Sequence, residues 1–197
     1  TGDAYADFMH GQAAVTTLLL ALAGSALIGS DYRQGGMVFY LSRSIGKTHY
    51  IIGKLLTVGT VVGVITMLPA LVLFIEYATL SSSLEYLFDN WRILVGIVGY
   101  GLILGVVQSL LLFAIAAWIP RTVPLVMTWL GLFALLTALA HALEEIRDER
   151  RWLLLALWED MARLGRWCFG AYPDDRLPRP WESGAVLLGV CAVCLVL

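Results

Sequence analysis

Long apolar runs alternate with short polar segments along this chain of 197 residues. The runs cover about residues 12–29, 51–75, 92–118, 123–140 and 183–197. A helix of about 20 apolar residues crosses the ~30 Å of hydrocarbon in a bilayer. The pattern therefore predicts an all-α membrane protein, a polytopic transmembrane helix bundle with about five spans in a single transmembrane domain over residues 1–197.

Composition supports a membrane protein. Hydrophobic residues make up 59% of the chain, whereas soluble domains contain about 45–50%. The chain starts at Thr1 and ends at Leu197 inside a short apolar run. We therefore expect at least one further helix upstream and the rest of one downstream. No patch combines basic and aromatic residues, so we do not expect nucleic acid as a partner.

The charges divide between the two sides that alternating spans would create. Segments 31–54 and 119–122 carry five basic residues and one acid, a net charge of +4. Segments 1–11, 76–92 and 141–182 carry eight basic residues and fourteen acids, a net charge of −6. The positive-inside rule for short loops places segment 31–54 in the cytoplasm. The seven Arg residues of 141–182 argue for the opposite orientation.

Segment 141–182 is an amphipathic helical segment that we expect at the membrane surface. Within it, His141, Glu144, Glu145 and Asp148 share one helical face, a pattern that could hold a metal. Because no second histidine lies nearby, we favour a solvated face and expect no metal site. Cys191 and Cys194 form C-x-x-C inside an apolar run, which indicates packed thiols rather than a redox or zinc site.

Segment 31–54 contains Gly46-Lys47-Thr48, which matches the end of a phosphate-binding loop. Leu41 occupies the position of the first glycine in that loop, so no nucleotide site is expected. We find no catalytic motif and no charged residue in the middle of a span, and we predict no enzyme activity. Two interpretations of the segment remain: a helix that docks into a partner, or a basic loop on anionic headgroups.

The run from Gly35 to Lys54 resembles the cytoplasmic segment of permease subunits of type-2 ABC exporters, the ABC-2 membrane family. Ser44 stands where proline is common in that family, and Gly46 where serine is common; Lys47 replaces an arginine. The positions that match the family pattern are Gly36, Leu41, Ser42, Arg43, Ile45, Tyr50, Gly53 and Lys54.

The resemblance implies six spans in the full protein, of which this chain holds the second to the fifth and the start of the sixth. Residues 31–50 would form a cytoplasmic coupling segment with a coupling helix. Residues 141–182 would form the outer helical segment. The resemblance thus favours the orientation that the short loops indicate.

The implied function is that of a permease subunit in an ATP-driven exporter of the bacterial inner (plasma) membrane. The implied partners are a second permease copy and two ATPase subunits. An accessory extracytoplasmic protein is a further candidate partner. ATP and Mg²⁺ would bind to the ATPase, and this chain would need no cofactor. An ion-coupled secondary transporter and a non-catalytic membrane scaffold are the alternatives. The residues expected to contact the ATPase are Arg33, Met37, Phe39, Tyr40, Leu41, Arg43 and Lys47.

Overall fold

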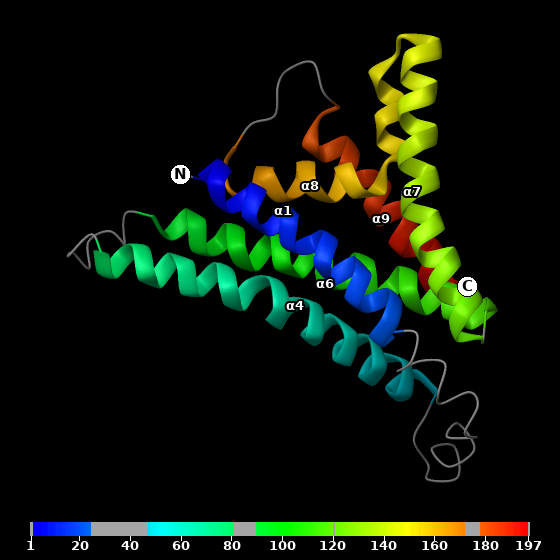
Figure 1. Cartoon of the computed structure of the whole chain (residues 1–197), viewed down its shortest axis with the longest axis horizontal. Coiled ribbons are helices and arrows are strands. Elements are labelled where there is room, and N and C mark those ends of the chain that lie inside the picture. Colours follow the sequence, from blue (N-terminus) through cyan, green and yellow to red (C-terminus); the bar gives the residue numbers. More distant parts are fainter. Residues whose placement is uncertain (1, 25–46, 81–89, 120, 172–177, 197) are drawn as a thin grey trace.

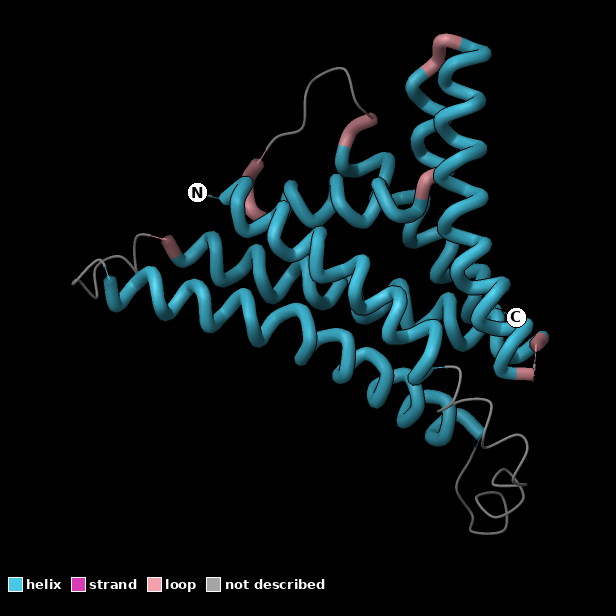
Figure 2. Tube along the Cα trace, in the orientation of Figure 1, coloured by secondary structure: helices cyan, strands magenta, loops and turns pink. Residues whose placement is uncertain are grey.

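The structure is a computed structural model that describes residues 2–24, 47–80, 90–119, 121–171 and 178–196. Within these residues every regular element is helical (Figures 1 and 2). The elements are α1 (Gly2–Leu19), the π-helical η1 (Leu20–Gly24), α4 (Lys47–Leu80), α6 (Trp91–Trp118), α7 (Thr122–Arg147), the 3-10 helix η2 (Arg150–Leu155), α8 (Leu157–Cys168) and α9 (Pro180–Val196).

Three of these helices are long and apolar enough to cross a membrane. They are α6, α7 and the part of α4 from Ile51 to Leu80. Helix α9 is apolar but shorter. The described chain is therefore all-helical, and by length and composition it is a candidate multi-pass membrane protein.

The helices extend beyond the apolar runs that the sequence marks. Helix α4 continues through Pro69 to Leu80, past the predicted boundary at 75. Helix α7 continues past 140 to Arg147, where Asp148 adopts a left-handed conformation (φ 51°) and ends it. Hydropathy marks the depth of the hydrocarbon, whereas a helix ends where the backbone turns, so the two boundaries differ.

Helix α1 starts at Gly2, although residues 1–11 are polar enough to be expected ahead of the first span. Its apolar positions explain this early start. Tyr5 and Met9 are buried one turn apart, and the Tyr5 ring lies 6.4 Å from that of Phe74 on α4. The polar residues Asp3 and Asp7 are exposed on another face of the helix.

Helices α4 and α6 run side by side (Figure 1), and glycines set their spacing. A Cβ added to Gly105 of α6 would lie 3.3 Å from the carbonyl oxygen of Gly59 on α4. Small residues allow transmembrane helices to approach this closely. On the other side of α6, buried Gln108 donates a hydrogen bond of 2.9 Å to the Thr17 hydroxyl of α1.

Helices α1, α4 and α6 alternate in direction, so their ends fall into two groups, and α7 rises steeply from the end of α6 (Figure 1). At one end of the bundle, α1 and η1 finish at Gly24, α4 begins at Lys47, and α6 leads into α7. We name this the α6–α7 end. At the opposite end, which we name the α8 end, lie Gly2 and the short helix α8, since Gly2 approaches Phe169 just beyond α8.

Candidate functional site

Most of the residues predicted to contact an ATPase lie outside the described residues. These are Arg33, Met37, Phe39, Tyr40, Leu41 and Arg43. Lys47 is described as the first residue of α4. What the structure provides is the position of the two flanks of this segment.

Both flanks of residues 25–46 lie at the α6–α7 end, because η1 finishes there at Gly24 and α4 begins there at Lys47 (Figure 1). The connection between α6 and α7, with the exposed Arg121, lies at the same end. The described flanks of residues 25–46 and of residue 120 therefore lie at one end of the bundle. Segments 31–54 and 119–122 together carry the net charge of +4 found in the sequence.

An apolar groove of about 670 Å³ lies between α4 and α6. Met67 forms part of its wall by lying against Gly101, where a Cβ would overlap the Met67 side chain. The polar residues along the groove are Thr60 and Ser109, and no charged residue lines it. The groove offers no group that could recognise a polar ligand by charge.

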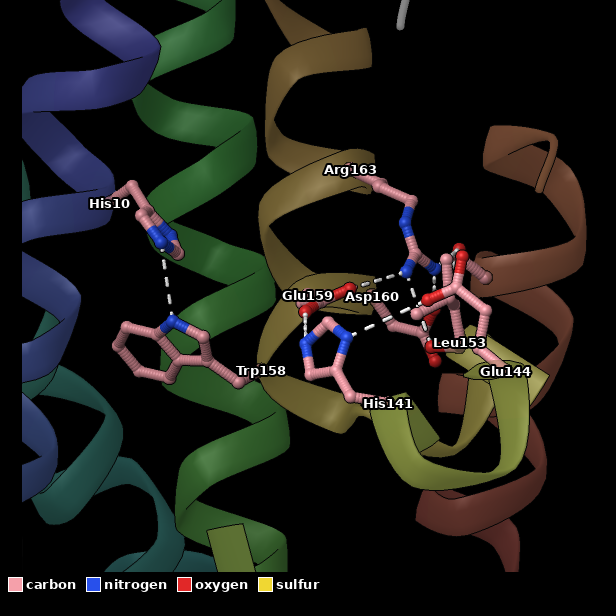
Figure 3. Close-up of polar contacts among 9 residues, drawn as sticks. His10, His141, Glu144, Leu153, Trp158, Glu159, Asp160 and Arg163 are labelled. Carbon is pink, nitrogen blue, oxygen red and sulfur yellow. Dashed lines mark hydrogen bonds and ion pairs between the residues drawn. The ribbon is translucent and has the colours of Figure 1, made fainter. Parts of the chain in front are cut away.

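The α8 end holds a buried polar cluster, drawn in Figure 3. Asp160 and Arg163 on α8 are 0% and 5% exposed. The Arg163 Nη1 lies 2.6 Å from Asp160 Oδ1, and its Nη2 lies 2.9 Å from Glu159 Oε2. Nη2 also donates 3.2 Å to the Leu153 carbonyl of η2. One guanidinium thus joins two carboxylates and a neighbouring element.

Helix α9 reaches this cluster through Ser183. The buried Ser183 hydroxyl donates 2.8 Å to Asp160 Oδ1 and lies 3.3 Å from Arg163 Nη1. Burial raises the pKa of Asp160 to about 7, against the opposing effects of the Ser183 hydrogen bond and the Arg163 charge. The cost of removing a charged carboxylate from water outweighs both partners.

Helices α7 and α1 join the cluster at its edges. The His141 Nε2 of α7 lies 2.8 Å from Glu159 Oε1, and its Nδ1 lies 3.7 Å from Glu144. On the other side of α8, Trp158 Nε1 donates 3.2 Å to His10 Nε2 of α1 (Figure 3). The cluster therefore ties α8 to helices from both halves of the chain.

Asp160 and Arg163 of α8 are buried, and a sequence signal for their burial exists. Asp160 follows Leu157 by three positions and precedes Leu164 by four, so it lies on the apolar face of α8. On the predicted solvated face of α7, His141, Glu145 and Asp148 are exposed. His141 contacts both Glu144 and Glu159.

No protein-family model, no curated protein and no solved structure matches this chain.

Proposed function

We propose that this chain is the membrane-spanning permease subunit of an ATP-driven exporter of the ABC-2 type. The observation that carries the proposal is the position of the two described flanks of residues 25–46. These residues contain most of the family-like motif, and their flanks, Gly24 and Lys47, both lie at the α6–α7 end. A coupling helix has to face the compartment that holds the ATPase, and Lys and Arg collect on the cytoplasmic side.

The aromatic and basic residues of this segment would suit it to dock into a groove on a partner subunit. Phe39 and Tyr40 would fill an apolar groove, and Arg43 would pair with an acidic side chain there. Nucleotide binding would move the docked segment, and the motion would enter the bundle at Lys47, where α4 begins. The membrane helices would then shift as rigid bodies between two arrangements.

The test is to co-express the chain with an ABC-type ATPase subunit from the same organism and to purify the complex. We expect the Phe39→Ala/Arg43→Ala double variant to insert normally but to lose most of the bound ATPase and of the chain-dependent change in ATPase activity. Arg121→Ala is the matched control, because Arg121 is an exposed cation in the other short connection at the same end. Normal ATPase binding by the double variant would rule the proposal out.

The same preparation distinguishes the alternatives. Reconstituted alone in vesicles, the chain should move no cargo in response to a proton or sodium gradient. Gradient-driven transport in the absence of any ATPase would assign it instead to the ion-coupled secondary transporters.

A further inference from the structure

In the cluster at the α8 end, two carboxylates share one buried cation. Glu159 and Asp160 are two carboxylates, and Arg163 is the cation that contacts both. Asp160 has no exposed surface and Arg163 is 5% exposed. An uncompensated charge in such surroundings is costly, and the usual outcome is that a group binds a proton and becomes neutral.

The geometry shows where a proton fits. Both hydrogen bonds to the Asp160 carboxylate, from Arg163 and from Ser183, are received by Oδ1. Oδ2 is buried and has no hydrogen-bond partner among the described residues. A neutral carboxylic acid is compatible with this arrangement, because Oδ1 remains an acceptor as the carbonyl oxygen while Oδ2 carries the proton, and the buried negative charge is removed.

Among the described residues, the ion pair of Asp160 is with Arg163. The α9 element contributes the neutral Ser183 hydroxyl, and η2 contributes the Leu153 carbonyl, which accepts from Arg163. His141 of α7 lies against Glu159 rather than Asp160. The remaining titratable and charged groups on the elements packed around α8 are Asp3, Tyr5, Asp7 and His10 of α1, Arg92 and Tyr100 of α6, Glu144, Glu145 and Arg147 of α7, Arg150 and Arg151 of η2, and Glu182, Cys191 and Cys194 of α9.

We propose that Asp160 is a proton-binding residue, and that a proton on its Oδ2 holds α8 docked against α9 and η2. The α8 end would thereby respond to the acidity of the medium that it faces. Ser183 and Arg163 are positioning residues, which keep Oδ1 bonded so that Oδ2 receives the proton. This inference does not depend on the proposed transport function.

The direction follows from the burial of the carboxylate. Docked Asp160 has a pKa near 7, and a solvent-exposed Asp has one near 3.9. The docked state therefore binds the proton more tightly, and docking is favoured below the exposed value. The advantage is lost as the pH rises towards 7. Between about pH 6 and about pH 8 the docking equilibrium should weaken about tenfold.

Two measurements on the full chain in lipid nanodiscs test the proposal. Infrared spectroscopy should detect a protonated carboxylic acid at about pH 6 that disappears by about pH 8. Hydrogen exchange of the α8 amides, corrected for the intrinsic effect of pH, should be about tenfold faster at the higher pH. The Asp160→Asn variant imitates the protonated acid. It should lack the infrared band and keep slow exchange at both pH values.

Two further variants make the test specific. Glu145→Gln removes an exposed acid of α7 and should respond to pH as the wild-type chain does. Ser183→Ala removes the hydrogen bond that lowers the pKa of Asp160, so its exchange transition should move to higher pH. Exchange that is independent of pH in the wild-type chain, a response retained in Asp160→Asn, or an unmoved transition in Ser183→Ala would each overturn the proposal.

Discussion

At the scale of single residues, Arg163 holds the α8 end together. Its planar guanidinium reaches Glu159 and Asp160 on its own helix, the Leu153 carbonyl of η2 and the Ser183 hydroxyl of α9. An ammonium group has no such fork, so lysine cannot reproduce these directions. The neighbouring Arg166 makes a single exposed pair with Asp7 at 2.8 Å.

At about pH 8, where Asp160 is ionised, we expect Arg163→Ala to lower the free energy of unfolding by about 3–5 kcal/mol, because it leaves this carboxylate buried without its cation. Arg163→Lys should recover part of this loss. Arg166→Ala, the matched control on the same helix, should cost less than about 1 kcal/mol. The measurement is thermal or denaturant unfolding of the purified chain in detergent. Equal losses for Arg163→Ala and Arg166→Ala would contradict this role of the buried arginine.

Trp129 makes the second residue-scale prediction. It is buried on α7 and donates 3.0 Å from Nε1 to the Thr17 carbonyl of α1. Trp129→Phe should cost about 1–3 kcal/mol from the lost bond, with a further loss from the cavity. Trp118→Phe is the control, because Trp118 is 73% exposed at the end of α6. A similar effect of both changes on the unfolding midpoint would show that the hydrogen bond contributes nothing.

At the scale of elements, α8 is the helix whose packing against its neighbours could not be predicted from the sequence. Alternating runs of apolar residues predict the long helices well, since a bilayer demands a fixed length of hydrocarbon. An amphipathic helix of 12 residues carries no such length signal. The sequence pattern of its charged residues is the same whether water or another helix covers them. Asp160 is the example: its position on the apolar face was visible, but the Ser183 hydroxyl that meets it comes from 23 residues away.

Two boundaries within 141–169 were also beyond the sequence pattern. Asp148 ends α7 by adopting φ 51°. Asparagine and aspartate tolerate this conformation, but their presence in a sequence does not predict it. The next break falls at Ala156, between η2 and α8. Both depend on how η2 packs back against α7. The predicted contact residues from Arg33 to Arg43 lie outside the described residues and stay predictions.

The close contact between α8 and α6 can be tested at Gly165. A Cβ there would come within 2.5 Å of the rigid, buried ring of Tyr100. Gly165→Ala should therefore destabilise the chain by about 1–3 kcal/mol through overpacking, despite the better helix propensity of alanine. Gly131→Ala is the control, because a Cβ on this α7 glycine meets nothing within 4 Å. It should be neutral or stabilising by up to about 1 kcal/mol. Greater stability of Gly165→Ala would argue against the α6–α8 packing.

At the scale of the whole molecule, the proposed orientation places the α6–α7 end in the cytoplasm and the α8 end outside. The structure assigns Arg121 and Glu145 to opposite ends of α7, both exposed. In a background without Cys168, Cys191 and Cys194, single cysteines at these two positions report the orientation directly.

We expect Glu145→Cys to react with a membrane-impermeant maleimide in intact spheroplasts. Arg121→Cys should react only after the membrane is opened. The physical reason is that about 30 Å of hydrocarbon separates the two positions. Labelling of both cysteines after the membrane is opened serves as the control for accessibility. The reverse labelling pattern would show that the α6–α7 end lies outside the cell, where no ATPase could dock.

The two flanks of residues 25–46 differ mechanically. On one flank, α4 runs from Lys47 towards Pro69, and the part ahead of this proline is a rod of roughly 33 Å at 1.5 Å per residue. On the other flank the α-helical hydrogen-bond ladder gives way to the π-helical η1, directly after Thr17 is fixed by Gln108 and Trp129. A displaced ladder bends more readily than a regular helix. A force on the segment would therefore be transmitted along the stiff start of α4. At the other flank the chain would bend at η1, while Thr17 stays fixed.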